Sequence, residues 1–225
     1  MYPERWFAHN WLIKKAVNTK VSARLTSMSG TVLDFGCGQR PFERDILRYA
    51  DQYIGVDWTS TLHDLRADVI ADLNQPLPLC DAMADHVVSF EVLEHLAEPG
   101  VMLREAFRVL RPGGQITLSV PFQWWIHEAP WDYQRFTRHG LEYQLRKAGF
   151  ENIVIEATTG FWAMWVLKLN YQLARMVQGP RLMRIVIRTV LVPFWLLSQT
   201  IAPLMDRAWA EERETAGYVA TARKP

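Results

Sequence analysis

Cysteine is scarce in this sequence of 225 residues, and charge of one sign has no clear excess. The two cysteines, Cys37 and Cys80, have no partner at metal-ligand spacing, so the sequence predicts free thiols in a reducing compartment and no metal site. The 25 basic and 24 acidic side chains leave a formal net charge of +1. Because proteins that hold nucleic acid through their overall charge need a basic surface, this balance indicates no nucleic-acid partner.

The N-terminus lacks the uncharged apolar core that a secretory signal peptide requires. Its first residues include Glu4 and Arg5, and Lys14 and Lys15 follow soon after them. A chain without such a core is not expected to be exported. The sequence therefore predicts a cytoplasmic protein.

Between residues 30 and 160, short apolar segments of strand length alternate with segments of helical periodicity. Strands are expected at residues 31–35, 53–57, 68–71, 86–90, 115–120 and 152–157, and helices at 41–50, 91–96, 100–110 and 139–148. This alternation predicts an α/β core in which helices cover both faces of a parallel sheet. An N-terminal segment, 1–29, is expected to hold a helix over residues 4–27, and segment 214–225 a last strand over 217–222.

The turn after the first predicted strand contains Gly36 and Gly38, which let the backbone come close to a ligand at the carboxyl end of that strand. A dinucleotide-binding loop would place a third glycine where this sequence has Pro41. The proline weakens the interpretation as a nicotinamide-dependent oxidoreductase. A cofactor without a phosphate, such as S-adenosylmethionine, needs no phosphate cradle in this turn.

Acidic side chains follow the next two predicted strands. Asp57 ends the second strand, where its carboxylate can accept hydrogen bonds from two ribose hydroxyls. Trp58 could lie against an adenine ring, and Asp72 could accept from the adenine amino group. Since ligands bind at the carboxyl ends of parallel strands, this ordered series indicates a nucleoside cofactor.

Four segments together resemble the class I S-adenosylmethionine-dependent methyltransferases of type 11, over about residues 30–158. They are residues 32–38, 53–57, 90–96 and 108–114. The resemblance implies a Rossmann-like sheet of seven mostly parallel strands with an antiparallel last strand, and S-adenosylmethionine as cofactor. The residues expected to bind this cofactor are Asp34, Gly36, Cys37, Gly38, Asp57, Trp58, Asp72 and Glu91. The sequence departs from the family at Arg40, where many members have another glycine; this side chain is expected to narrow the loop without abolishing binding.

The segment after the fifth predicted strand, residues 127–137, resembles a subgroup associated with glycan, lipid and other cell-envelope pathways. It should lie above the cofactor. His127 is the candidate general base, and Asp132 could orient it. Arg135 could hold an anionic group of the substrate, although an ion pair between Asp132 and Arg135 could instead simply shape the loop.

Three further residues flank the expected substrate pocket. His95 and Tyr133 are candidate substrate contacts, but a structural role such as helix capping is the alternative for His95. Glu94 is expected to be structural.

Residues 161–205 contain no acidic side chain and are otherwise apolar, aromatic and basic. Together with the polar residues that follow, they form a predicted insertion over 161–213 with two helical halves split at 178–180. Each half is expected to have one basic or polar face, with Lys168, Gln172 and Arg175 in the first half and Arg181, Arg184 and Arg188 in the second. The opposite faces carry Trp162, Trp165, Leu169, Ile185, Val192 and Trp195. A basic face opposite an apolar face is typical of a helix that lies in a membrane surface with anionic headgroups, here the inner face of the cell membrane.

The same insertion allows other interpretations. The uncharged segment 189–205 is short for a membrane span and contains Pro193 and Pro203. A single crossing would also strand the last β-strand on the far side. A lid over the active site or a homodimer interface remains an alternative.

The sequence as a whole predicts methyl transfer to an oxygen of a lipid, a lipid-linked sugar or another envelope-related small molecule. A nicotinamide-dependent oxidoreductase and a non-catalytic membrane-associated scaffold with the same fold are the alternatives.

Overall fold

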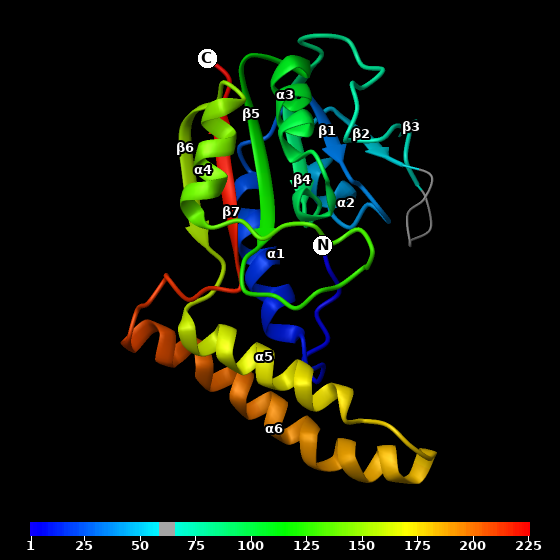
Figure 1. The fold of residues 1–225 in the computed structure, drawn as a ribbon, viewed down its shortest axis with the longest axis vertical. Coiled ribbons are helices and arrows are strands. Elements are labelled where there is room, and N and C mark those ends of the chain that lie inside the picture. The colour runs from blue at the N-terminus through cyan, green and yellow to red at the C-terminus, as the bar shows by residue number, and fades with distance from the viewer. Residues whose placement is uncertain (59–65) are drawn as a thin grey trace.

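A computed structural model of the protein describes residues 1–58 and 66–225. Seven strands form one sheet in the order β3-β2-β1-β4-β5-β7-β6 (Figure 1). The strands are β1 (Thr31–Phe35), β2 (Gln52–Asp57), β3 (Val69–Ile70), β4 (Ala84–Phe90), β5 (Leu110–Pro121), β6 (Glu151–Ala157) and β7 (Gly217–Arg223). β1 to β5 pair in parallel, whereas β7 runs antiparallel to both β5 and β6. The predicted Rossmann-like sheet with an antiparallel last strand is confirmed.

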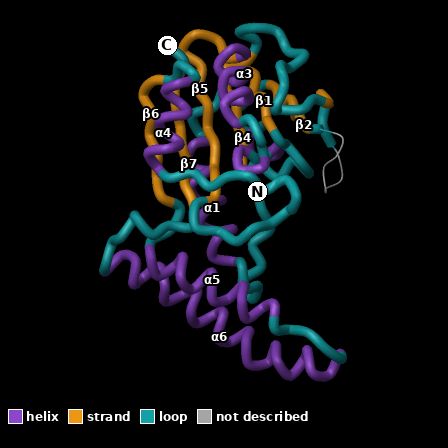
Figure 2. Tube along the Cα trace, viewed as in Figure 1, coloured by secondary structure: helices purple, strands orange, loops and turns teal. Residues whose placement is uncertain are grey.

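Helices cover both faces of this sheet (Figure 2). They are α1 (Trp11–Leu25), α2 (Glu43–Ile46), the 3-10 turn η1 (Leu93–His95), α3 (Pro99–Val109) and α4 (Arg138–Lys147). The helices expected at 41–50 and 91–96 are therefore one short turn each. The segment expected to start a helix at Glu4 folds back along α1 instead, because the backbone of Tyr2 pairs with the side-chain amide of Asn18 through bonds of 3.1 and 2.8 Å.

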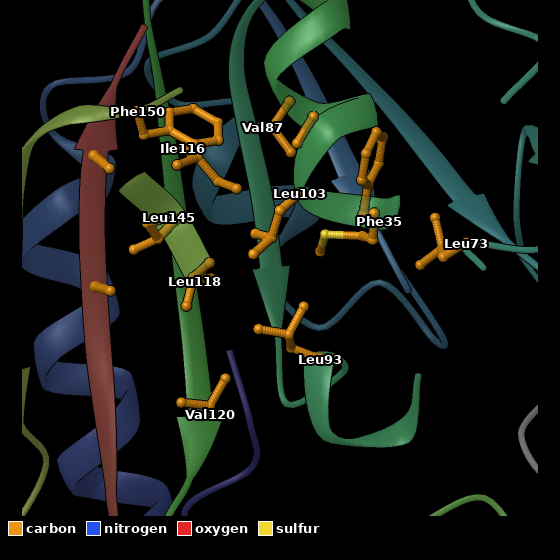
Figure 3. Packing of buried hydrophobic residues seen from close by; sticks show 14 of the residues in the cluster. Phe35, Leu73, Val87, Leu93, Leu103, Ile116, Leu118, Val120, Leu145 and Phe150 are labelled. Carbon is orange, nitrogen blue, oxygen red and sulfur yellow. The ribbon is translucent and has the colours of Figure 1, made fainter. Parts of the chain in front are cut away.

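Apolar side chains fill the space on either side of the sheet. On one face, Leu103 of α3 and Leu145 of α4 pack with Ile116 and Leu118 of β5 and with Phe150 (Figure 3). On the other face, α1 and α2 pack through Val21, Leu25, Phe42 and Ile46 against Val32 and Val88. Each fully buried side chain of this size contributes about 1.5–3 kcal/mol relative to exposure. The two layers fix the strands, and so the positions of the residues that follow their carboxyl ends.

The remaining helices, α5 (Phe161–Arg175) and α6 (Arg181–Ala208), form a hairpin beyond the carboxyl edge of the sheet (Figure 1). The Asp206 carboxylate near the end of α6 accepts the backbone N–H groups of Gly160, Trp162 and Ala163 at 3.1, 2.8 and 3.2 Å. It therefore caps the N-terminus of α5. Buried Gln199 accepts the N–H of Leu12 at 3.0 Å and joins α6 to the start of α1.

Candidate active site

A cavity of about 450 Å³ lies at the carboxyl edge of the parallel strands, a size typical of small-molecule sites. Side chains and backbone from the ends of β1, β2 and β4 and from the segment after β3 form its wall. All of the residues expected to hold the cofactor line it: Asp34, Gly36, Cys37, Gly38, Asp57, Trp58, Asp72 and Glu91. The strand-end pattern of the sequence therefore converges on one place in the structure.

The glycine turn after β1 has a backbone that side chains would not tolerate. Gly36 has φ +78°, and a Cβ there would lie 2.3 Å from a methyl carbon of Val92. Gly38 also has a positive φ, but a Cβ there would meet no atom within 4 Å, because this residue faces open space in the cavity. The turn thus leaves a cradle in which a ligand can approach the backbone.

Asp57 holds the turn and faces the cavity at the same time. Its Oδ2 accepts the N–H of Gly38 at 2.7 Å, and its Oδ1 accepts the N–H of Trp58 at 2.8 Å. A carboxylate oxygen has more than one acceptor site, so each oxygen can still accept a ribose hydroxyl. Asp57 is therefore placed to bind a nucleoside while fixing the loop around it.

Asp34 at the end of β1 is the most deeply buried of these carboxyls. Burial raises its pKa to about 7, although the hydroxyl of Tyr53 donates a hydrogen bond of 2.6 Å to its Oδ2. Near neutral pH this carboxyl therefore exchanges a proton, unlike an ordinary surface aspartate.

Arg40, where the family often has glycine, adopts the backbone conformation that glycine favours, with φ +56°. Its guanidinium turns to Asp68 at 2.8 Å and Glu43 at 3.1 Å and lies over the ring of Tyr53. Arg40 is not among the lining residues of the cavity. The departure from the family pattern therefore leaves the cavity open.

In the loop after β5, Asp132 holds His127 and Arg135 together. Its Oδ2 accepts the backbone N–H of His127 at 2.8 Å and lies 3.3 Å from the ring Nδ1. Arg135 donates to both oxygens, at 2.5 and 2.7 Å. Burial favours the neutral acid, but the hydrogen bonds from Arg135 and from the backbone lower the pKa of Asp132 to about 2. The orienting contact and the ion pair, weighed as alternatives from the sequence, are both present.

His127 lines a second cavity of about 200 Å³, together with Glu91, rather than the main one. Its ring meets that of His95 edge to face, with centroids 4.8 Å apart. Burial, and then the neighbouring His95, lower the pKa of His127. A neutral imidazole at physiological pH can accept a proton, as a general base must.

The other predicted substrate contacts have distinct surroundings. His95 lines the main cavity, and its Nδ1 bonds the carbonyl of Trp131 at 2.8 Å, so the ring fastens the loop rather than capping a helix. Tyr133 lines neither cavity and is exposed. Arg135 is engaged by Asp132 and by the carbonyls of Gln134 and Trp125. The structure therefore brings His95 to the site but leaves Tyr133 outside it.

Two aromatic residues of the site were not expected from the sequence. Tyr2 lines both cavities, and its ring packs edge to face on Phe42. Trp131 lines the main cavity and meets Trp58 edge to face, with centroids 5.6 Å apart. Trp131 lies within the aromatic loop segment that the sequence marks, whereas nothing near Tyr2 in the sequence signals its position.

Comparison with known proteins gives one family for this chain. A family model described as a methyltransferase domain matches residues 12–155. A probable S-adenosylmethionine-dependent methyltransferase of Mycolicibacterium smegmatis is 34% identical over 122 residues, which are 52% of this chain and 45% of that protein. A ubiquinone biosynthesis O-methyltransferase of Xanthomonas oryzae is 32% identical over 111 residues, which are 44% of this chain and 46% of that protein. The chain spans about half the length of these relatives.

Solved structures share the fold at low sequence identity. A phosphoethanolamine N-methyltransferase of Haemonchus contortus in complex with S-adenosyl-L-methionine has a TM-score of 0.60 at 17% identity, covering 98% of this chain and 56% of that one. A methyltransferase from Archaeoglobus fulgidus described as SAM dependent has a TM-score of 0.58 at 16% identity, covering 95% and 94%. The predicted class and its cofactor, S-adenosylmethionine, are confirmed, whereas the envelope-pathway subgroup stays a prediction. The chain belongs to the methyltransferase domain family.

Proposed function

We propose that this protein transfers a methyl group from S-adenosylmethionine to an oxygen of a lipid or lipid-linked acceptor at a membrane surface. The observation that carries the methyl-transfer part is the single cavity that collects the eight predicted cofactor residues. Its residues fit the cofactor. Gly38 leaves open space for a ligand, and Asp57 keeps acceptor capacity for a ribose.

When bound, S-adenosylmethionine supplies a methyl group on a sulfonium sulfur; as the new O–C bond forms, the C–S bond breaks and its electron pair stays on sulfur. The residues of this chain have to hold the acceptor in line and receive the hydroxyl proton. His127 is the candidate for that proton, because its pKa is lowered and Asp132 fixes its ring.

The direct test is transfer of a labelled methyl group to fractionated envelope lipids and glycans. We expect label in a lipid or lipid-linked fraction, and label in no fraction would refute the acceptor. Calorimetry with S-adenosylhomocysteine and NAD, side by side, tests the cofactor. Binding of NAD without any response to S-adenosylhomocysteine would indicate the oxidoreductase instead.

The membrane part of the proposal rests on the exposed face of α6. Seven large apolar side chains, here called the outer face, follow each other at spacings of three or four residues and are 39–68% exposed: Met183, Val186, Val190, Phe194, Leu197, Ile201 and Leu204. Such spacing places them on one side of the helix. By length and composition α6 is also long and apolar enough to cross a membrane. An exposed apolar stripe of this length needs a partner.

The face of α6 opposite the outer face divides into two parts. Toward the C-terminus, Trp195 and Ala202 are buried against the rest of the protein. Toward the N-terminus, the same row continues with Arg181, Arg184 and Arg188. An apolar face opposite arginines suits a helix lying in the plane of an anionic bilayer. A single crossing does not suit this topology, because β7 returns to the sheet between β5 and β6.

The hairpin also touches the loop that carries His127. The ring of Trp125 lies 3.8 Å from that of Tyr171 on α5, centroid to centroid, and Arg175 lies over the same tryptophan. Lys168 of α5 donates to Gln123 at 2.7 Å. A membrane-bound hairpin would therefore hold this loop close to the bilayer, which favours an acceptor that resides there.

Flotation with anionic liposomes tests this part. We expect the full chain to float with the liposomes. The combined variant Val186→Asp, Val190→Asp, Leu197→Asp should remain in the unbound fraction at the bottom of the gradient. Tyr143→Asp is the matched control, because this exposed aromatic residue belongs to α4 and not to the hairpin, and it should float like the parent. A full chain that never floats but sediments as a dimer, which the combined variant dissociates, would identify a second copy as the partner.

A further inference from the structure

Three side chains beside the main cavity, one carboxylate and two imidazoles, form a cluster of potential metal ligands. Glu94 and His95 belong to η1, and His127 belongs to the loop after β5. One carboxylate or imidazole atom of each lies within 4.8 Å of those of the other two. Glu94 Oε1 and His95 Nε2 are 3.6 Å apart, too far for a hydrogen bond. The cluster therefore encloses a space between one carboxylate and two imidazoles.

The Glu94 carboxyl has no partner that would explain its burial. Its side chain is fully buried, and within residues 1–58 and 66–225 neither oxygen accepts a hydrogen bond. Buried polar groups without a partner are rare in folded proteins. A cation placed against this carboxyl would supply the missing partner.

Both imidazoles have their Nδ1 atoms occupied. His95 Nδ1 lies 2.8 Å from the carbonyl of Trp131, which can only accept, so this nitrogen carries the proton and Nε2 has a free lone pair. His127 Nδ1 lies 3.3 Å from both Asp132 and the carbonyl of Trp125. Arg135 also approaches this nitrogen, but Asp132 already holds its guanidinium. Oxygen acceptors on one ring nitrogen are the usual outer support of a histidine whose other nitrogen binds a metal.

We propose that Glu94, His95 and His127 bind a divalent transition-metal ion. Two imidazoles with one carboxylate are a ligand set for Mn²⁺, Fe²⁺, Co²⁺ or Zn²⁺, and they leave coordination positions open. Metal–ligand bonds of about 2.0–2.2 Å place two ligands at most roughly 4.4 Å apart. Three ligands on one ion cannot all lie opposite each other, so neighbouring ligand atoms are nearer to about 3–3.6 Å apart. The 3.6 Å between Glu94 and His95 already fits this spacing, and the longest separation in the cluster has to shorten by about 1 Å.

The position of the cluster beside the main cavity suggests a role for the ion in the reaction. His95 lines the main cavity, and Glu91, which lines both cavities, lies three residues before Glu94. In a role that rests on the proposed methyl transfer, an open coordination position would hold the acceptor oxygen and lower the pKa of its hydroxyl. His127 would then act as a ligand and not as the base.

Titration of the EDTA-treated full chain with Co²⁺ alone tests the binding, with visible absorption as the signal. We expect Glu94→Gln, His95→Gln and His127→Gln each to weaken Co²⁺ binding by at least about 10-fold. The matched control is His139→Gln, an exposed histidine on α4, which should bind like the parent. No Co²⁺ binding by the parent, or binding that all three variants retain, overturns the proposal.

The unmodified chain provides a second measurement in case a variant does not fold. Paramagnetic Mn²⁺ should broaden the NMR signals of two of the six histidine rings before the others. Uniform broadening of all rings overturns the proposal. Ion binding without labelled methyl transfer refutes the proposed function alone, and methyl transfer without ion binding refutes this inference alone.

Discussion

The region around the main cavity and the α5–α6 hairpin differ in how they place their apolar side chains. At the cavity, apolar strands and helices are buried on both faces of the sheet and hold polar groups at the strand ends. On α6 the buried row is short, and a longer apolar row faces outward. Hydrophobic periodicity therefore identifies an apolar face of a helix, whereas only the surrounding structure identifies what covers that face.

The buried row and the outer face of α6 should respond differently to truncation of a large side chain. Trp195→Ala should lower the free energy of unfolding by about 3–5 kcal/mol, because this side chain is buried. Leu197→Ala on the outer face should change it by no more than about 0.5 kcal/mol. Denaturant unfolding measures both. Equal losses would mean that the outer face is covered within the folded chain.

Asp34 tests whether the main cavity contains a carboxyl group whose ionisation destabilises the folded state. Its folded pKa of about 7 exceeds the value of about 4 in an unfolded chain, so the folded state keeps a proton that the unfolded state has lost. The contribution of this carboxyl to stability is therefore full below pH 4 and lost as the pH rises through 7. The parent should lose roughly 2–4 kcal/mol relative to Asp34→Asn over this window. If the free energies of unfolding of the parent and of Asp34→Asn depended on pH in the same way, the raised pKa of Asp34 would be contradicted.

Asp57 tests the cavity as a binding site. Asp57→Ala should weaken the binding of S-adenosylhomocysteine by about 1.5–3 kcal/mol, the range for hydrogen bonds to a charged group. Calorimetry gives the affinity. Asp51→Ala, an exposed aspartate just before β2, is the control and should bind normally. Unchanged affinity in Asp57→Ala would remove this residue from the site.

The smallest expected effect concerns the arginines at the free end of the hairpin. Arg184→Gln should weaken binding to anionic vesicles by up to about 1 kcal/mol, because one attraction to headgroups is lost. Binding to neutral vesicles should stay the same. Vesicle sedimentation at two lipid compositions measures the difference, and an equal loss on both would point to a structural role for Arg184.

The sheet and the lining of the main cavity could be predicted because strand ends of a parallel sheet meet at one edge. Asp57 and Asp72 were predicted in this way, each from its position at or just after the end of a predicted strand, whereas Asp34 and Glu91 came from the family resemblance. Tyr2 could not be found, because its place depends on a long-range pairing with Asn18 rather than on local sequence.

The hairpin was predictable as two helices but not in its orientation. The sequence placed Trp195, Ile185 and Val192 on one apolar face that would meet the membrane. The structure corrects this, since Trp195 is buried against the protein and the exposed stripe runs through residues such as Val190 and Leu197. Helical spacing gives relative angles only, and the contact that selects the inner row comes from other parts of the chain, such as Leu12 bonded to Gln199.

The cap that Asp206 places on α5 has a mechanical consequence. It ties the last turn of α6 to the first residues of α5, so the hairpin is fastened at its base and its tip projects freely (Figure 1). A helix of 28 residues is about 42 Å long. Docking of its free arm on a flat bilayer would set the tilt of the whole domain, so that the cavity mouth searches for its acceptor in two dimensions rather than three.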